Sequence, residues 1–280
     1  MSALSKRATT KDRGVLTERA YAKLNLALHV RGRRPDGRHD IETIFAFCED
    51  GDELTAEESL DSRFELHVSG ETASELGTEN LVADAWTDLK RAAGYDRGVR
   101  FTLDKRLPVA SGLGGGSADA AAALRLLTRL WEIDAQLAQD VAPGLGADVP
   151  ACLLSHSCSG AGAGDQLEPI DLGLGGTAVL LINPRLALST GEVFAAWDRI
   201  DRGPLGNWRE GRNDLEAPAT RMVPEIAHLL KWLSSQPGAS FVRMSGSGAT
   251  CFALFDSIDE RDAAAKACPV HWWRLATRLR

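Results

Sequence analysis

Four glycines stand within five positions of the stretch RLPVASGLGGGSADA, which begins at Arg106. Glycine loses more backbone freedom on folding than any other residue, so such a cluster needs a reason. Glycines let backbone N–H groups approach an anion closely, and a helix that follows adds its own free N–H groups and the positive end of its dipole. The stretch from Pro108 to Ala118 is therefore predicted to hold phosphate groups.

This glycine loop does not fit the two commonest phosphate-binding patterns. A P-loop places a lysine after its glycines, and the dinucleotide pattern GxGxxG needs glycine at position 117, where the chain has Ser117. A tight turn or close helix packing is the structural alternative, although a turn needs only one or two glycines. The residues of the predicted phosphate cradle are Pro108, Val109, Ala110, Ser111, Gly112, Leu113, Gly114, Gly115, Gly116, Ser117 and Ala118.

A second loop of small residues stands near the C-terminal end, in RMSGSGATCF. Ser245, Gly246, Ser247 and Gly248 separate two apolar runs, which predicts a strand, a turn and a second strand. Alone, this stretch is equally well explained as an ordinary hairpin turn. Two glycine loops, neither of them a P-loop, are more informative together than either is alone.

The elements that must position these loops follow from hydrophobic periodicity. Residues 21–30 alternate as a strand, with Lys23, Asn25, Ala27 and His29 on one face. Further strands are predicted at 41–49, 63–70, 98–109, 177–184, on both sides of the second glycine loop and at 270–275. Helices are predicted at 80–94, 117–133, 189–200, 222–236 and 259–268. A loop that enters a short apolar segment is predicted at 142–155, a flexible connector at 161–170 and a further loop at 204–218.

The strands and helices do not alternate strictly, which favours an α+β fold. The soft stretch at 156–176 is the best candidate for a domain boundary. We expect a disordered tail over residues 1–18, an N-terminal domain over 19–165 and a C-terminal domain over 166–280. The tail is polar and lacks the apolar core of a secretory signal.

Composition narrows the functional classes. The chain has 280 residues, 44% of them hydrophobic, and a formal net charge of −7. That charge disfavours general nucleic-acid binding, which depends on neutralising phosphates. No apolar run approaches the ~20 residues of a membrane span. The five cysteines are scattered and form no CxxC pair, which predicts buried thiols in a reducing cytoplasm and no zinc site.

Three segments, in this order along the chain, resemble the motifs of the GHMP kinases, which phosphorylate small-molecule hydroxyl groups with ATP: AKLNL, PVASGLGGGSADA and MSGSGAT. The longer block AYAKLNLALHVRGRRPDGRHDIET, with LGADVPACL and NDLE, resembles the branch that phosphorylates the 2-hydroxyl of a cytidylated methylerythritol in non-mevalonate isoprenoid synthesis. The resemblance covers residues 19–256. It implies a ribosomal S5 domain 2-like N-terminal domain, a ferredoxin-like C-terminal domain, ATP and Mg²⁺.

The same resemblance implies two catalytic residues. Asp148 in GADVP matches the catalytic aspartate, which can accept the substrate proton or orient the hydroxyl. Lys23 in AYAKLNL matches the catalytic lysine, a cation that would favour the charged carboxylate and stabilise a developing alkoxide. Without the resemblance, Lys23 is better explained as a solvent-exposed lysine on a strand. The residues that hold a metal are not predicted.

For the substrate, the resemblance implies Asn25, His39, Thr190 and Phe194, with His39 hydrogen-bonding the cytosine and Phe194 stacking on it. The structural alternatives are a surface histidine at a turn and a core phenylalanine. Tyrosine usually precedes this histidine and stacks on the other face of the base, but here the residue is Arg38. A guanidinium also stacks on aromatic rings, so Arg38 either replaces the platform or leaves it thinner.

Two further functions stay open at this point. One is a GHMP kinase that acts on another alcohol, such as mevalonate, homoserine or a sugar. The other is a nucleotide-binding relative without catalysis, against which the retention of Lys23 and Asp148 argues. We expect a cytoplasmic protein with a small-molecule substrate, no nucleic acid or membrane partner, and a monomer or weak homodimer.

Overall fold

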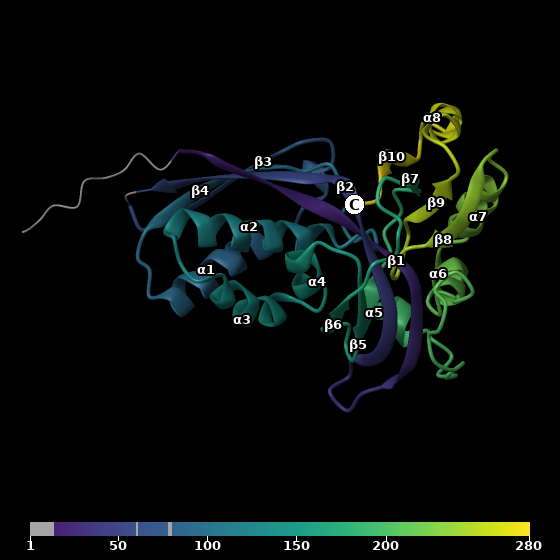
Figure 1. Cartoon of the computed structure of the whole chain (residues 1–280), viewed down its shortest axis with the longest axis horizontal. Coiled ribbons are helices and arrows are strands. Elements are labelled where there is room, and N and C mark those ends of the chain that lie inside the picture. Colours follow the sequence, from purple (N-terminus) through teal and green to yellow (C-terminus); the bar gives the residue numbers. More distant parts are fainter. Residues whose placement is uncertain (1–13, 60, 78–79) are drawn as a thin grey trace, which may run out of the picture.

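The computed structural model describes residues 14–59, 61–77 and 80–280, which build two β-sheets arranged as an L (Figure 1). The first sheet has the strand order β3-β4-β2-β5-β6, with β1 paired to β2. Its strands are β1 (Leu16–Arg33), β2 (His39–Ser59), β3 (Phe64–Ser69), β4 (Gly98–Asp104), β5 (Cys158–Ala161) and β6 (Gln166–Pro169). The second sheet has the order β10-β7-β9-β8. Its strands are β7 (Ala178–Asn183), β8 (Ala239–Met244), β9 (Cys251–Phe255) and β10 (Trp273–Arg278).

Helices cover one face of each sheet (Figure 1). Under the first sheet, α2 packs its alanine-rich side against β1 and β2, where small side chains allow a close approach. The helices of this layer are α1 (Leu81–Ala93), α2 (Gly115–Trp131), α3 (Ala135–Leu145) and α4 (Val149–Leu154), with a 3₁₀ turn at Ala73–Glu75. The helices of the C-terminal half are α5 (Thr190–Ala195), α6 (Glu216–Met222), α7 (Glu225–Ser234) and α8 (Ile258–Ala267).

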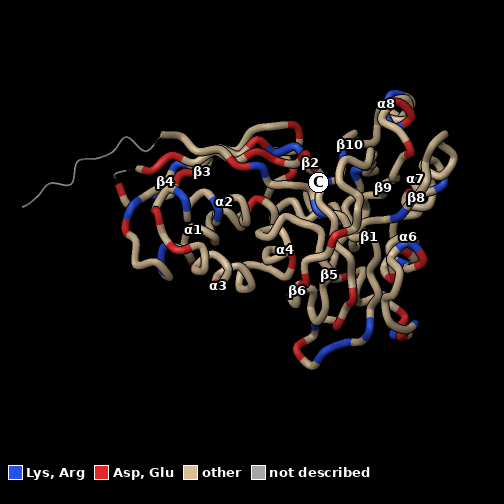
Figure 2. Tube along the Cα trace, viewed as in Figure 1, with Lys and Arg blue, Asp and Glu red and all other residues tan. Residues whose placement is uncertain are grey.

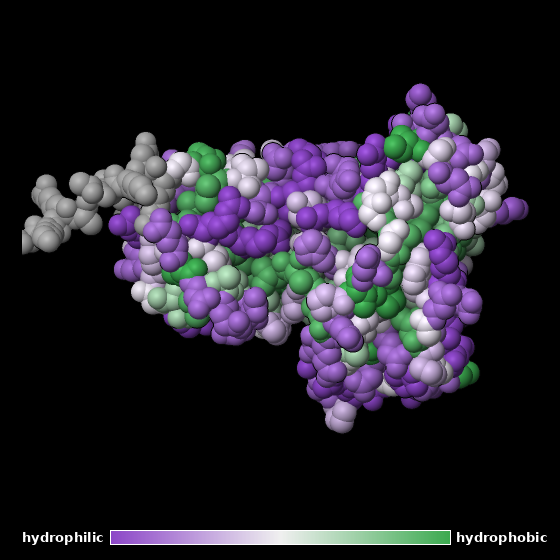
Figure 3. All heavy atoms as spheres, viewed as in Figure 1, coloured by the Kyte–Doolittle hydropathy of each residue, from purple (hydrophilic) through white to green (hydrophobic). Residues whose placement is uncertain are grey.

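The middle of β1, residues 22–30, is buried on both faces, because the strand runs from the first sheet into the contact with the second. Leu24 and Leu26 lie in a hydrophobic cluster that also contains Leu181 of β7 and Phe252 of β9. Burying a leucine side chain contributes roughly 1.5–3 kcal/mol, so this cluster holds the two sheets together. On the face shown in Figure 3, apolar residues also gather in the angle where the two halves meet.

The structure corrects several predicted elements. The loop predicted at 142–155 contains the end of α3 and all of α4; Pro143 and Gly144 suggested a loop, but they occupy the last turn of α3. The connector predicted at 161–170 is largely the turn and second strand of the β5–β6 hairpin. The helix predicted at 222–236 is α7, which begins only after Pro224, and the additional helix α6 begins within the loop predicted at 204–218. Strand β4 ends at Asp104 instead of continuing to 109.

The structure also differs from the predicted domain boundaries at two points. Residues 1–13 of the predicted tail lie outside the described residues, but Leu16 already belongs to β1, so the tail prediction extends too far. The predicted division between residues 165 and 166 falls directly before β6, which pairs with β5 in the first sheet. That sheet therefore continues to Pro169.

Acidic and basic residues are interspersed along the described trace (Figure 2). None of the described helices combines the length and the apolarity needed to cross a membrane. All five cysteines are buried and free.

Candidate active site

The two glycine loops pack directly against each other, although they lie more than 130 residues apart in the sequence. The Ser245 hydroxyl donates to the Gly112 carbonyl (2.9 Å), and Thr250 N–H donates to Ser111 O (3.1 Å). Gly112 has φ +77°, and a Cβ there would lie 2.3 Å from the Ser245 carbonyl oxygen. Only glycine allows this approach. The hairpin-turn interpretation is thus too narrow: the second loop buttresses the first.

Helix α2 begins at the end of the first glycine loop. Its N-cap is Gly114, with φ +65°, and no side chain caps the helix. The first N–H groups of a helix have no acceptor within it, so they are available to an anion. A cavity of about 370 Å³ opens here. The predicted residues that line it are Lys23, Asn25, Ala110, Ser111, Gly112, Gly114, Gly115, Gly116, Ser117, Asp148, Thr190, Phe194, Gly246 and Ser247.

Lys23 lies at the base of this cavity. Its Nζ contacts Asp148 Oδ2 at 3.0 Å and donates to Asn25 Oδ1 at 2.8 Å. The Lys23 side chain is 4% exposed and that of Asp148 36%, so the carboxylate faces the cavity while the lysine supports it from below. Gly114 makes room for the pair, because a Cβ at Gly114 would lie 3.1 Å from Lys23 Cε. The burial of Lys23 excludes the solvent-exposed alternative.

Asn25 is fixed by a chain of buried hydrogen bonds. Its Nδ2 donates to Thr43 Oγ1 (2.8 Å), which donates to the Ala27 carbonyl (2.7 Å). Its backbone N–H donates to Ser245 Oγ (3.2 Å), which links β1 to the second glycine loop. The β1–β2 register shifts between Asn25 and Ala27, and such irregularities redirect side chains near functional sites.

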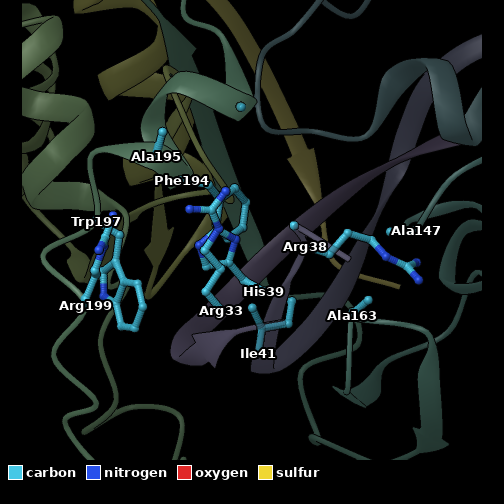
Figure 4. A pocket seen from close by; sticks show the side chains of 12 residues that line it. Arg33, Arg38, His39, Ile41, Ala147, Ala163, Phe194, Ala195, Trp197 and Arg199 are labelled. Atoms are coloured by element: carbon cyan, nitrogen blue, oxygen red, sulfur yellow. The ribbon is translucent and has the colours of Figure 1, made fainter. Parts of the chain in front are cut away.

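A second cavity of about 300 Å³ adjoins the first, and Ile41, Ala147, Ala163 and Phe194 line both. Its aromatic wall is compact. The ring centroids of His39 and Phe194 lie 4.8 Å apart in a stacked arrangement, and Trp197 meets His39 edge-on at 5.9 Å. Figure 4 shows His39, Phe194 and Arg33 close together on one side of this cavity.

Arg38 lies on the opposite side of the second cavity and points toward Ala147 (Figure 4). Its guanidinium binds Asp36 through Nε (3.0 Å) and Nη2 (2.9 Å), and its side chain is 58% exposed. Hydrogen bonds from the backbone and side chain of Arg38 lower the pKa of Asp36. The guanidinium is thus turned away from the ring of Phe194.

Arg33 and Arg199 bring further positive charge to the second cavity. Within the described part of the chain, neither makes an ion pair with an acidic side chain. Burial, together with the charge of Arg33, lowers the pKa of His39, so its imidazole is neutral at neutral pH. Trp197, Arg33 and Arg199 were not predicted from the sequence. Arg33 lies directly opposite the predicted residue His39 in the β1–β2 hairpin. That position was the signal that could have identified Arg33.

Six predicted residues do not line either cavity and act as supports. Leu113 and Ala118 are buried in hydrophobic clusters, and Pro108 and Ser245 are buried as well. Val109 is exposed and its N–H binds Glu75, whereas Gly248 sits against Met244. Thr190 reaches the second glycine loop, with its hydroxyl 2.8 Å from that of Ser247.

Asn213 belongs to the NDLE segment, which contributes to the resemblance, but no role was predicted for it from the sequence. Its Nδ2 donates to the carbonyls of Met244 and Gly246, both at 2.8 Å. Asn213 therefore fixes the second glycine loop from behind. The next residue, Asp214, accepts from the N–H of Val30 (2.8 Å), so the segment also ties β1 to the C-terminal half.

The cavity offers oxygen ligands of the kind that Mg²⁺ prefers. Asp148 supplies a carboxylate and Ser117 a hydroxyl, and the Ser111 hydroxyl is buried without a hydrogen-bond partner among the described residues. Among the described residues, no group of three or more His, Cys, Asp or Glu side chains is arranged to hold a metal ion. Mg²⁺ typically uses one or two protein oxygens and takes the rest from phosphates and water, so these residues fit a metal that arrives with a nucleotide.

Comparisons with known proteins agree with this arrangement. The chain matches the GHMP kinases N-terminal domain over residues 80–156 and the GHMP kinases C-terminal domain over 195–271. These matches confirm the predicted two-domain α+β fold. The homoserine kinase of Cytophaga hutchinsonii, 16% identical, has the same fold, with a TM-score of 0.66 over 99% of this chain and 98% of its own.

More similar proteins share one name. The 4-diphosphocytidyl-2-C-methyl-D-erythritol kinase of Rhizorhabdus wittichii is 54% identical over 94% of both chains, and that of Novosphingobium aromaticivorans is 52% identical over 95% of this chain and 93% of its own. A crystal structure of 4-(cytidine 5'-diphospho)-2C-methyl-D-erythritol kinase, 34% identical, gives a TM-score of 0.82 over 94% of this chain and 99% of that chain. The chain therefore belongs to the 4-diphosphocytidyl-2-C-methyl-D-erythritol kinase family of the GHMP kinases.

Proposed function

We propose that this chain transfers the γ-phosphoryl group of ATP to the 2-hydroxyl of 4-diphosphocytidyl-2-C-methyl-D-erythritol. The observation that carries the proposal is the junction of the two cavities. One holds a glycine cradle and the Lys23–Asp148 pair, and the other an aromatic wall with arginines. A cytidylated alcohol has a reacting hydroxyl for the first cavity and an anionic diphosphate and a base for the second. The names of the relatives support the same substrate.

The triphosphate of ATP would lie across the first glycine loop. The uncapped N-terminus of α2 offers N–H donors, and the positive end of a 17-residue helix dipole favours the negative charge. Because the loop contains no lysine, the cationic side chain at the reacting phosphate is Lys23, which comes from β1. This division of labour explains the departure from the P-loop pattern.

In the proposed reaction, the substrate oxygen bonds to the γ-phosphorus, the bond to the β-phosphate oxygen breaks, and ADP leaves. The hydroxyl proton passes to Asp148, the carboxylate that faces the cavity. Lys23, fixed by Asn25, orients this carboxylate and stabilises charge on the reacting oxygens. Since phosphoryl transfer needs little covalent help, alignment and electrostatic stabilisation carry most of the catalysis.

We further propose that Mg²⁺ accompanies ATP, with Ser117, Ser111 and Asp148 as the protein oxygens available to it. When bound, the metal would neutralise charge on the β- and γ-phosphates. The cytosine end of the substrate would lie against Phe194 and His39, and Arg33 and Arg199 would attract the diphosphate. Binding of the base would require the direct stack of His39 on Phe194 to open.

The proposal is tested by measuring ADP release from the purified chain with a panel of alcohols: the cytidylated methylerythritol, mevalonate, homoserine and galactose. We expect turnover with the first alone. Turnover with mevalonate but not with the cytidylated alcohol would overturn the substrate assignment. ATP binding without turnover of any acceptor would favour a non-catalytic relative.

We also propose that the protein works in the cytoplasm, as a monomer or a weak homodimer. Its five buried, free cysteines suit a reducing compartment. Light scattering at the assay concentration measures the oligomeric state, and a stable higher oligomer would contradict this expectation.

A further inference from the structure

A buried ion cluster lies beneath the glycine loop and takes no part in the reaction described above. Nζ of Lys105, which follows β4, contacts Asp52 Oδ2 on β2 at 2.5 Å and Asp119 Oδ2 on α2 at 2.8 Å. The three side chains are at most 4% exposed. They belong to three elements that are brought together only by folding.

The cluster contacts the chain on both sides of the glycine loop. Before the loop, Asp52 Oδ1 accepts the backbone N–H groups of Arg106 (2.6 Å) and Leu107 (2.8 Å), and Pro108 comes next. After the loop, Asp119 lies in the second turn of α2. At the start of that helix, a Cβ on Gly115 would lie 3.1 Å from Lys105 Nζ. The spacing between the two ends of the loop therefore depends on these contacts.

Stability alone is a poor explanation for such a cluster. Removing three charged groups from water is costly, and well-packed apolar residues often replace buried ion pairs with no loss of stability. Burial raises the pKa of Asp119, which reflects that cost. Charge-assisted hydrogen bonds do, however, have narrow geometry, so they define positions more sharply than apolar contacts do.

We propose that Lys105, Asp52 and Asp119 are positioning residues that hold the two ends of the glycine loop at the separation needed by the phosphates of ATP. They act through the backbone N–H groups of the loop and of α2, without touching the nucleotide. The inference rests on the proposed function, because it assigns the loop to ATP. It predicts that disturbing the cluster weakens nucleotide binding and leaves binding of the cytidylated alcohol intact.

The test distinguishes an effect on the geometry of the glycine loop from an effect on the stability of the protein. In the double variant Lys105→Met/Asp119→Leu, apolar side chains replace the tie between the strand and α2, while Asp52 keeps its two backbone partners. Calorimetry with adenylyl imidodiphosphate, an ATP analogue that is not cleaved, should show affinity reduced about tenfold, the scale of one charge-assisted hydrogen bond. Affinity for the cytidylated alcohol should change less than about twofold, well within the effect of a single weak contact.

Thermal unfolding of the same variants provides the control. Because Asp52 stays buried without its cation, the double variant should unfold below the wild-type temperature but remain folded at the assay temperature. The milder Asp119→Asn variant should show a smaller loss of analogue affinity. Arg261→Met removes a buried cation on α8, far from the loop, and should lower the unfolding temperature without changing analogue affinity.

Two outcomes of the calorimetry with the ATP analogue have different consequences. A folded double variant that binds the analogue as tightly as wild type overturns the inference and leaves the proposed function standing. Failure of the wild type to bind the analogue overturns the proposed function, and the inference with it.

Discussion

Lys23 links segments that are far apart in the sequence. Its ammonium group lies between Asn25 and Asp148, and its backbone N–H donates to the Leu113 carbonyl in the glycine loop (2.9 Å). Alternation of residues 21–30 predicted that Lys23 and Asn25 share a face. It could not predict that both faces are buried, or that Asp148 is the partner, because a strand pattern carries no information about contacts between distant segments.

His39 gives a pH prediction at the residue scale. Because burial and Arg33 lower its pKa below the ordinary 6.5, the imidazole stays neutral as pH falls through that value. Affinity for the cytidylated alcohol should therefore be constant from about pH 8 to 6.5 and weaken only at lower pH, where protonation would leave the imidazole without an acceptor for a hydrogen bond from cytosine. Calorimetry without ATP measures this, and His39→Gln should lose the acid dependence. Weakening that begins above pH 7 would contradict the account.

Arg38 gives a second prediction. Since its guanidinium binds Asp36 and is turned away from Phe194, Arg38→Tyr should supply a stacking ring and lower KM for the cytidylated alcohol, by up to about tenfold for one base–aromatic stack. Arg34→Tyr is the matched control: Arg34 lies in the same turn but outside both cavities, and KM should not change. A large rise in KM for Arg38→Tyr would mean that the guanidinium itself contacts the substrate.

At the scale of elements, the sequence predicted the glycine loop and α2 well because local chemistry determines both. Glycines, a preceding strand and an alanine-rich helix are read from neighbouring residues. Lys105 shows the opposite case. Between Asp104 and Arg106 it has the pattern of a charged strand end, and nothing local indicates that it lies 1% exposed between two carboxylates. The same limit explains why the β5–β6 hairpin was predicted as a connector.

The contact between the two glycine loops gives a prediction for Gly112. Gly112→Ala adds a Cβ at positive φ and 2.3 Å from the Ser245 carbonyl oxygen, so the loops must separate. We expect KM for ATP to rise and the free energy of unfolding to fall by about 1–3 kcal/mol. In Gly144→Ala, near the end of α3, the new Cβ meets nothing within 4 Å, and stability should stay level or rise. Equal behaviour of the two variants would contradict the proposed packing.

At the scale of the whole molecule, the site is assembled where the two halves meet. The N-terminal half supplies the cradle, Lys23 and Asp148, and the C-terminal half supplies Thr190, Phe194 and the second glycine loop. The α+β class and the order of the motifs were predictable from the sequence. The junction of the two cavities was not, because it depends on how the hydrophobic cluster around Leu24 and Phe252 joins the sheets.

The central claim is that Asp148, supported by Lys23, serves phosphoryl transfer to the cytidylated alcohol. The most direct test is single-turnover transfer of labelled phosphate from ATP to that alcohol, comparing wild type, Asp148→Asn and the control Asp140→Asn on the exposed side of α3. We predict transfer of one phosphate by wild type and by the control, and a rate lower by about 10² or more for Asp148→Asn. An unchanged rate for Asp148→Asn, or no transfer by the wild type, would contradict the account.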